Sequence, residues 1–201
     1  WRGTEHRLAR FYRRVLVMGI EVAVAGSTRT DNARLESINI TSTIRAKGSY
    51  AEVVFHSSAP ATWRPEAGNE IIISTTSDAL RHFGGVIERV TETPANRRVF
   101  EYACDCKDYT WLFDRRMVAT NYATSSGAAI LADIVNSYTT GFSTAGIDNL
   151  GNIPAQRFDY VYPSEAFNAI AAIQQAHWYI DFNKVVQYFT AITDVAPTTG
   201  I

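Results

Sequence analysis

The sequence predicts an α+β fold in which a small antiparallel β-barrel is followed by a mixed α/β subdomain of helices and a closing hairpin. About six short runs of alternating apolar residues follow one another in the first half, which is typical of a small barrel or sandwich. After Cys106 the apolar spacing changes to the roughly 3.6-residue period of a helix. We therefore expect a basic arm at residues 1–14, a barrel at 15–106, an α/β subdomain at 107–190 and a C-terminal extension at 191–201.

The composition excludes several classes of protein. The chain has 201 residues, of which 46% are hydrophobic and 19% are charged, so it can bury one good core or two small ones. Its formal net charge of −1 provides no overall field that would attract nucleic acid or an anionic membrane. No run approaches the roughly 18 apolar residues of a spanning helix. We expect a globular chain without sequence-specific nucleic-acid binding or stable membrane insertion.

Alternation in the first half predicts the strands of the barrel. The run from Val15 to Ala25 would place its even-numbered residues toward a core. In the run from Tyr50 to His56, the inward side chains would be Ala51, Val53 and Phe55. The other predicted strands are residues 35–44, with Ile38 and Ile40 on one face, residues 69–74, and the two strands of a hairpin at 83–90 and 99–106.

The hairpin at residues 83–106 shows the alternation most clearly. A turn at Pro94-Ala95-Asn96 would join its strands, because proline and asparagine favour turns. Its second strand would be covered on one face and wet on the other, with Glu101 and Asp105 on the wet face. The covered face would carry Phe100, Tyr102, Cys104 and Cys106.

Two glycines follow Phe83 in the first strand of this hairpin. Gly84 and Gly85 lack side chains, which would permit a bulge or a close backbone approach in a tightly curved sheet. A β-branched residue would not fit there. Gly84→Val is therefore expected to destabilise the fold by about 1–3 kcal/mol.

The second half carries the signals of helices. Asp108 is expected to cap a short helix, with Arg115 and Arg116 near its far end to complement the helix dipole. Ser125 or Ser126 can cap a second helix. The apolar stripe of that helix would consist of Ile130, Leu131, Ile134, Val135 and Tyr138, with Asp133 and Asn136 facing outward.

A third helix and a hairpin close the predicted subdomain. Ser164 is expected to cap the helix, with Glu165 in its first turn. Residues 178–182 and 185–189, joined by a turn at Asn183-Lys184, predict the closing hairpin. The buried side of the helix would be formed by Phe167, Ile170, Ala171 and Ile173.

The polar residues form no pattern that indicates catalysis or metal binding. Cys104 and Cys106 would share one strand face, where residues two apart are poorly placed for a mutual disulfide, so we expect buried, reduced, structural thiols. No second cysteine pair completes a metal shell, and the histidines at positions 6, 56, 82 and 177 lack metal-binding spacing. Glu165 is a lone acid for which a helix-cap role is expected. We expect no enzymatic activity, no cofactor and no bound metal.

Residues 1–14 form a locally basic arm. Five arginines against Glu5 give this segment a charge of +4. The arm is either a solvated tail or first helix, or an extension that docks on an acidic neighbour or a nucleic-acid backbone. The candidate inter-chain contacts are Arg2, Arg7, Arg10, Arg13 and Arg14.

Taken in order, the segments of the chain resemble the hub proteins of phage tails and baseplates. This family includes the late control protein D type and the N-terminal hub part of tail-associated proteins of long-tailed phages. The resemblance covers roughly residues 15–190. The segments that carry it are VLVMGIEVAVAG, SINIT, YAEVVF, EIIIS, FGGVIERV, CKDYTWLFDRRMVATNY, ILADIVNSY and YPSEAFNAIAAIQQAHWYIDFNKVVQYF.

The resemblance implies structural roles for the matching positions rather than catalytic ones. In this family a β-barrel is followed by a small α/β insertion. The matching positions lie in a barrel strand, in the segment that leaves the barrel, in the helix before the closing hairpin and in that hairpin. They are Phe83, Gly84, Ile87, Asp108, Leu112, Val118, Ser164, Ala166, Ile170, Tyr179 and Asp181.

The resemblance also implies a function, a location and a set of partners. Three copies of the chain would form a ring beneath the tail tube, in the virion at the tail tip or baseplate. Other partners would be a tail-tube or distal-tail ring protein, the end of the tape measure and the tail spike or fibre proteins. Independently of the resemblance, the five arginines of the basic arm on a near-neutral chain predict that the arm lies at or near a boundary between chains, against an acidic partner surface.

Two other function classes stay open on the sequence. A receptor- or carbohydrate-binding module of the tail tip would present Trp63, Trp111 or Trp178 as an exposed aromatic platform. A cell-wall hydrolase fragment would need a cleft with two acids about 5–9.5 Å apart.

Overall fold

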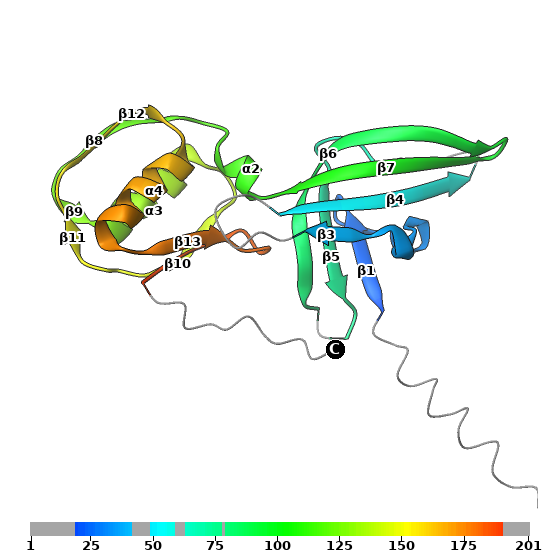
Figure 1. Ribbon diagram of the computed structural model, residues 1–201, viewed down its shortest axis with the longest axis horizontal. Helices are drawn as coiled ribbons and strands as arrows, with labels where there is room; N and C mark the ends of the chain where they lie inside the picture. Colours follow the sequence, from blue (N-terminus) through cyan, green and yellow to red (C-terminus); the bar gives the residue numbers. More distant parts are fainter. Residues whose placement is uncertain (1–18, 42–48, 59–62, 78, 191–201) are drawn as a thin grey trace, which may run out of the picture. The chain divides into compact units, whose positions relative to one another are not determined.

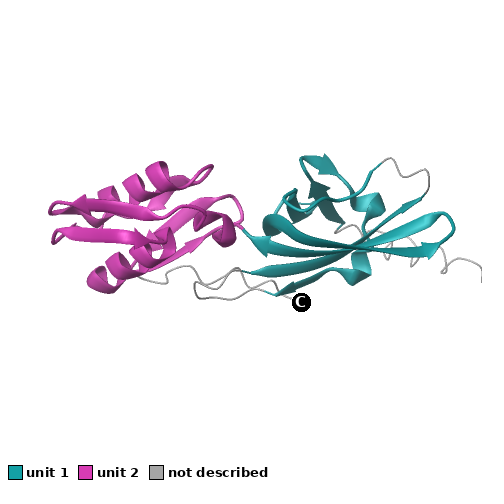
Figure 2. Ribbon diagram, turned by 90° about the horizontal axis from the view of Figure 1, so that it is seen from above, with its two compact units in different colours: residues 1–42, 49–108 teal, residues 43–48, 109–201 magenta. Residues whose placement is uncertain are grey.

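The computed structural model describes residues 19–41, 49–58, 63–77 and 79–190 (Figure 1). The chain divides into two compact units, with the division between Asp108 and Tyr109 (Figure 2). The predicted boundary after Cys106 lies slightly earlier, because the last strand of the first unit continues to Asp108. The basic arm, the start of the first predicted strand and the C-terminal extension fall outside the described residues.

Unit 1 is built on a seven-stranded, fully antiparallel sheet with the order β2-β1-β5-β6-β7-β4-β3. The described strands do not close into a barrel; they form a curved, open sheet (Figure 1). The strands are β1 (Ile20–Val24), β2 (Ser27–Thr28), β3 (Asn39–Thr41), β4 (Tyr50–Ser58), β5 (Glu70–Thr75), β6 (Arg81–Asn96) and β7 (Val99–Asp108).

The segment between β2 and β3 connects the two ends of this sheet. The Arg29 N–H donates to the Val22 carbonyl of β1 at 2.7 Å, and the Arg34 N–H donates to the Val54 carbonyl of β4 at 2.8 Å. The segment contains two short 3-10 turns, Thr30–Asn32 and Leu35–Ser37. It therefore covers backbone edges that an open sheet would otherwise expose.

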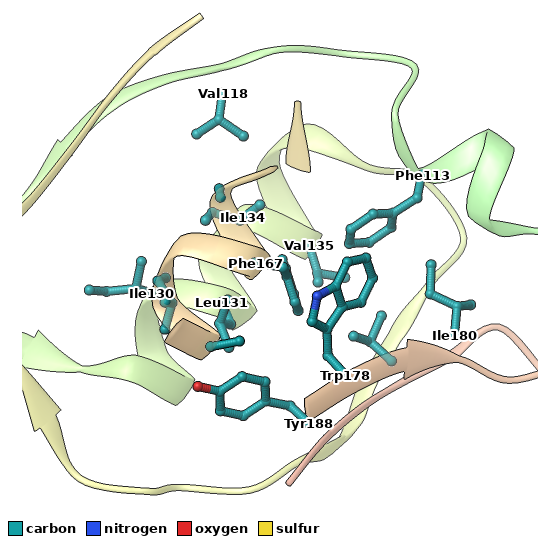
Figure 3. Close-up of a cluster of buried hydrophobic side chains, with 14 of the residues drawn as sticks. Phe113, Val118, Ile130, Leu131, Ile134, Val135, Phe167, Trp178, Ile180 and Tyr188 are labelled. Atoms are coloured by element: carbon teal, nitrogen blue, oxygen red, sulfur yellow. The ribbon is translucent and has the colours of Figure 1, made fainter. Parts of the chain in front are cut away.

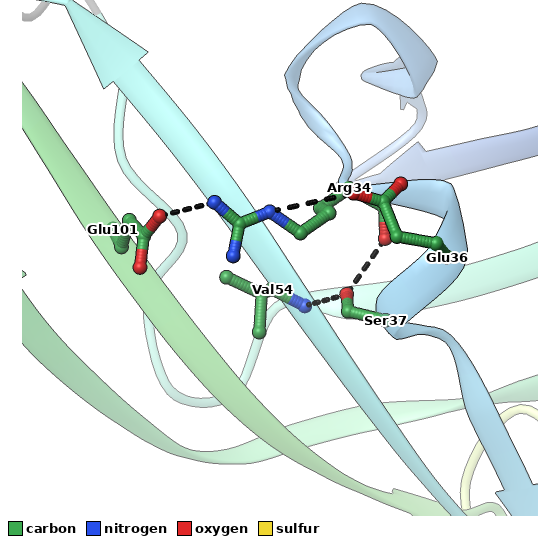
Figure 4. Close-up of polar contacts among 5 residues, drawn as sticks. All are labelled: Arg34, Glu36, Ser37, Val54 and Glu101. Atoms are coloured by element: carbon green, nitrogen blue, oxygen red, sulfur yellow. Dashed lines mark hydrogen bonds and ion pairs between the residues drawn. The ribbon is translucent and has the colours of Figure 1, made fainter.

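The strand predicted at residues 35–44 is wrong in its first part. The Ser37 hydroxyl donates to the Arg34 carbonyl at 2.6 Å and accepts the Val54 N–H at 3.0 Å (Figure 4). A side chain that bonds to the nearby backbone in this way offers the chain an alternative to a sheet ladder. The Arg34 guanidinium also pairs with Glu101 of β7 and lies 3.7 Å from Glu36, so the turn is held against the sheet.

The core of unit 1 confirms the predicted inward residues of β4. Ala51, Val53 and Phe55 are all buried. The covered face of β7 is confirmed for Tyr102, Cys104 and Cys106, whereas Phe100 is only partly buried. The core is completed by Val22, Val24, Ala33, Ile71, Ile73, Phe83, Val86 and Ile87.

The β6–β7 hairpin is longer than predicted, and its turn lies elsewhere. β6 runs through Pro94, which pairs with Phe100, and the turn is formed by Arg97 and Arg98. The Asn96 side chain stabilises this turn by accepting the Arg98 N–H at 2.8 Å. Proline is tolerated in a strand whose other edge needs no N–H donor.

The described part of unit 2 combines three helices with three small sheets. The sheets are β10-β14-β13, β9-β11 and β8-β12, and all of their pairings are antiparallel except β10 with β14. The helices are α2 (Thr110–Phe113), α3 (Gly127–Tyr138) and α4 (Pro163–Gln174). The strands are β8 (Val118–Tyr122), β9 (Ser125–Ser126), β10 (Ser143–Ile147), β11 (Asn152–Ile153), β12 (Gln156–Val161), β13 (His177–Ile180) and β14 (Val185–Phe189).

Aromatic rings hold the core of unit 2 together (Figure 3). The ring of Phe113 lies 5.3 Å from those of Phe142 and Phe167 and 5.8 Å from that of Trp178, measured between centroids. Most of these contacts are edge-on or tilted, which is the arrangement that aromatic pairs favour. The predicted stripe of α3 is confirmed, with Ile130, Leu131, Ile134 and Val135 buried and Tyr138 packed against the cluster.

The helix ends confirm some of the predicted caps and correct others. Ser126 caps α3, its hydroxyl accepting the Ala129 N–H at 3.1 Å. At α4 the cap residue is Tyr162, and Glu165 accepts its backbone N–H at 3.0 Å, which confirms the cap role of Glu165. Ser164 is not the cap: its N–H and hydroxyl bind Asp114 at 2.9 and 2.6 Å.

Two other predictions for unit 2 are wrong. Ile173, predicted on the buried side of α4, is 47% exposed. Asp108 does not cap α2, which ends before Arg115 and begins after Tyr109. Asp108 is instead the last residue of β7, and its carboxylate accepts a hydrogen bond from the backbone N–H of Ser49.

Candidate assembly surface

The positions that the resemblance singled out lie mainly in the two cores. Phe83 and Ile87 are buried in unit 1, whereas Val118, Ala166 and Ile170 are buried in unit 2. Leu112 packs on the edge of the unit 2 core. Buried apolar side chains of this kind stabilise packing and offer no chemistry.

Two carboxylates among these positions organise backbone rather than bind a ligand. Asp108 accepts the Ser49 N–H at 2.5 Å and donates its own N–H to the Ser49 carbonyl at 3.0 Å. Asp181 accepts the N–H groups of Asn183 and Val185 at 2.8 and 2.9 Å, which fixes the turn of the β13–β14 hairpin. Charged acceptors satisfy such backbone donors strongly.

Gly85, rather than Gly84, is the position of close backbone approach. A Cβ on Gly85 would lie 2.8 Å from the Cα of Asp108 and nearer still to the Lys107 carbonyl oxygen. Gly84 is buried and pairs in regular register with Ile72, while the register shifts of β6 fall on either side of it. The expected cost of Gly84→Val stays a prediction.

The two cysteines are buried free thiols in β7. Burial raises the pKa of Cys104 from its ordinary value of 9.0 to about 12, with a smaller contribution from the Asp105 carboxylate. Burial also raises the pKa of Cys106. Among the described residues, no group of three or more His, Cys, Asp or Glu side chains is placed to hold a metal ion.

We expect the native thiols to be unreactive toward a thiol-specific reagent at pH 8 and to react fully after unfolding, because only a thiolate attacks such reagents. Unfolded thiols ionise near pH 9 while the native Cys104 holds its proton to about pH 12. The unfolded state therefore loses protons first, and stability should fall as the pH rises through this interval. Rapid labelling of the native chain at pH 8 would contradict the burial.

The three tryptophans named as a platform differ in exposure. Trp178 is buried in unit 2, with only 8% of its surface exposed, and its indole N–H donates to Asn168 at 2.8 Å. Trp63 is partly buried beneath Arg29 and meets Phe55 edge-on. Trp111 is partly exposed and stacks under the Arg115 guanidinium at 4.0 Å. Trp178 therefore offers no exposed platform.

Unit 1 contains a shallow, open hollow. Two acids, Glu66 and Glu92, line it, and Glu66 lies 3.9 Å from Arg64. The other lining residues are Pro65, Ala67, Val90 and Tyr102.

No described helix is long and apolar enough to span a membrane.

A strained aromatic residue lies on the outer surface of unit 2. Tyr160 has a φ of +55° and 76% of its surface is exposed. It is the extra residue of a bulge in β12, between Asp159, which pairs with Ala119, and Val161, which pairs with Val118. A left-handed conformation costs a non-glycine residue roughly 1–2 kcal/mol. The sequence offers no signal for this residue, because tyrosine does not favour that conformation.

More large side chains are exposed beside Tyr160. Val161 pairs with Val118, which brings their neighbours Tyr162 and Met117 together on the outer side. The bonds from Asp114 to Ser164 hold the rest of the loop after α2 beside the start of α4. Tyrosine, tryptophan, methionine and arginine are the residues enriched in protein interfaces. This surface is the strongest candidate for contact with another chain.

No protein-family model matches the sequence, and no curated protein matches it. Solved structures of tail proteins do match, among them the three that follow. A 43 kDa tail protein of prophage MuSo2 from Shewanella oneidensis has a TM-score of 0.67 and 11% identity, over 85% of this chain and 53% of that one. Prophage tail protein gp18 from Listeria monocytogenes has a TM-score of 0.59 and 12% identity, over 84% and 49%.

A tail protein from Neisseria meningitidis matches with a TM-score of 0.56 and 13% identity, over 85% of this chain and 50% of that one. At these identities the likeness concerns the fold alone. This chain has a phage-tail type of fold, and both of its units take part in the match. It spans about half the length of the tail proteins that it resembles.

Proposed function

We propose that the chain is a structural component of a phage or phage-like tail and that three copies form a hub ring beneath the tail tube, at the baseplate or tail tip. The observation that carries the proposal is the fold likeness to three phage tail proteins, which extends over 84–85% of the chain. The order of sequence segments, which resembles that of tail hub proteins, supports the more specific role.

Unit 1 offers an edge that suits assembly. Beyond Ile87 the outer edge of β6 has no backbone hydrogen-bond partner among the described residues, although β7 pairs with its inner edge as far as Asn96. Free strand edges are templates for pairing with another chain. In the proposed ring, copies of the chain and tail proteins such as a tube or distal-tail ring protein, the end of the tape measure and a spike or fibre would cover such surfaces.

The proposed role is structural and includes no catalysis. The polar groups with the clearest geometry, Asp108, Asp114 and Asp181, all bind backbone or a hydroxyl within their own unit. A receptor- or carbohydrate-binding role would have to rest on surfaces other than Trp178, which is buried in the core. The hub role needs no ligand site.

Localisation in purified particles tests this proposal. An antibody to the chain, or a small tag inserted at the exposed turn of Arg97 and Arg98, should label one end of the tail in electron micrographs. The expected result is a single labelled site per tail at the tip or baseplate. Label along the tail tube or on the head, or particles without the chain, would contradict it.

A further inference from the structure

We propose that a strip on unit 2 binds an acidic patch on unit 1 of a second copy of the chain. The aromatic–arginine strip consists of Trp111, Arg115, Arg116, Met117, Tyr160 and Tyr162. The acidic patch consists of Tyr50, Glu52 and Asp105. This inference rests on the proposed function and deepens it, because it assigns the two surfaces that neighbouring copies in the ring would share.

The strip is one continuous surface made from two segments of unit 2. The ladder of β8 and β12, which lie side by side in Figure 1, places Met117 next to Tyr162. Asp114 binds Ser164 through both carboxylate oxygens, which keeps the two segments together beyond the ladder. The stacking of Arg115 on Trp111 extends the strip toward α2.

Tyr160 indicates that the strip has a role outside unit 2. Its left-handed backbone disfavours any residue except glycine, and its exposed ring adds nothing to the core. Ala25, Ala79, Gln175 and Lys184 also have a positive φ, but among these five described residues Tyr160 is the one large aromatic, and its ring is exposed. A large exposed aromatic beside a second tyrosine is typical of an anchor residue in an interface.

The charge of the strip selects an acidic partner. Of the four Lys and Arg residues between 109 and 190, Arg115 and Arg116 belong to the strip and Arg157 lies beside it. Arg157 is paired with Asp159 at 2.8 Å. Arg115 and Arg116 have no ion pair among the described residues, and the nearby Asp114 carboxylate is used by Ser164. The strip therefore presents two uncompensated cations among aromatic rings.

The acidic patch of unit 1 contains a carboxylate that lacks a cationic partner. Glu52 of β4 is exposed and stands directly opposite Asp105 of β7, an arrangement that like charges disfavour. Arg89 compensates Asp105 at 2.5 Å, while Glu52 has no ion pair in the described part of the chain. Two residues along the same face, the Tyr50 side chain is 51% exposed and stands opposite Lys107, whose ammonium pairs with Glu88. It supplies an aromatic contact beside the uncompensated acid.

The two surfaces are different parts of one chain, so each copy can use its strip on one neighbour and its acidic patch on another, which makes the repeated contact heterologous. A heterologous contact repeated around a rotation axis closes into a ring. The pairing would give Glu52 the cations that it lacks and cover the exposed rings of the strip. It therefore suits the proposed ring, in which every strip would meet the acidic patch of the next copy.

Sedimentation velocity of the full chain tests the pairing through charge reversal. Arg115→Glu with Arg116→Glu should weaken self-association by about tenfold or more, and Glu52→Arg should do the same. Combining the three substitutions should recover most of the lost affinity, because the ion pairs are restored in reverse. Asp148→Arg makes the same charge change as Glu52→Arg at an exposed position of unit 2 outside the strip, and it should leave association unchanged.

Tyr160→Gly separates binding from folding. Glycine accepts the left-handed backbone, so the melting temperature should not fall, whereas self-association should weaken several-fold. Wild-type chain that stays monomeric would overturn the proposed ring and this pairing together. If the wild-type chain self-associates and the strip variants self-associate equally strongly, the strip is not the interface, although the ring could still form. Sensitivity to the arginine substitutions without rescue by Glu52→Arg would overturn the acidic patch as its partner.

Discussion

Phe113→Ala is expected to cost about 3–5 kcal/mol of unfolding free energy, the range for removal of a fully buried phenylalanine. Phe113 is completely buried and touches the rings of Phe142, Phe167 and Trp178, so its loss leaves a cavity surrounded by aromatic edges. Urea unfolding followed by circular dichroism measures the change. Because these partners lie in α4, β13 and the loop after α3, no single neighbour can move to fill the space.

Ile173→Ala provides the matched control for this substitution. Ile173 is also a large apolar residue of unit 2, but its side chain is largely on the surface. Its truncation should change the unfolding free energy by about 0.5 kcal/mol or less. A loss below about 1 kcal/mol for Phe113→Ala, or equal losses for the two variants, would contradict the described core.

Gly85→Ala is expected to destabilise the chain by about 3 kcal/mol, at the upper end of the usual cost of overpacking. The added Cβ would meet the backbone of Lys107 and Asp108, which is fixed by the β6–β7 ladder and cannot move aside as a flexible side chain would. The melting temperature should fall by roughly 10 °C, given about 2–4 °C per kcal/mol for a chain of this size.

Ala103→Val is the control for Gly85→Ala. It enlarges an exposed side chain of β7, where a β-branched residue is favoured, and should change stability by about 0.5 kcal/mol or less. Unaltered stability of Gly85→Ala would show that β6 and β7 do not approach each other at this point.

Local periodicity predicted the elements that one face of a core determines. The alternation of Ala51, Val53 and Phe55 and the helical stripe from Ile130 to Val135 both match the buried residues, because burial of one face imposes its own period on the sequence. The closing hairpin is predicted instead by the turn residues Asn183 and Lys184 between two apolar runs. A phage-tail fold is supported by the tail-protein matches, whereas the described strands of unit 1 do not close into the predicted barrel.

Contacts between distant parts of the chain account for the errors. Ser164 has the sequence of a helix cap, yet it binds Asp114, fifty positions earlier, and no local pattern reports such a pairing. Likewise Ser37 bonds to Val54 and turns a predicted strand into a 3-10 segment. Pro94 is predicted in a turn because proline favours turns. It lies in β6 instead, because a free strand edge tolerates proline, and the sequence does not show which strand edges are free.

The candidate interface was partly visible in the sequence. The sequence indicates Trp111 as a possible platform and places Arg115 and Arg116 near a helix end, but their association with Tyr160 depends on the β8–β12 register. The left-handed backbone of Tyr160 arises from the bulge and has no signature in the residue type. The basic arm at residues 1–14 lies outside the described residues, so its place at a chain boundary remains a prediction.

The native mass of the purified chain in solution tests the proposed hub ring most directly. Light scattering coupled to size-exclusion chromatography, run over a range of concentrations, should give three times the 22.3 kDa mass of one chain. Electron micrographs of the same fraction should show rings with a central channel. A mass equal to one chain at every concentration, or a dimer that does not grow, would contradict the ring.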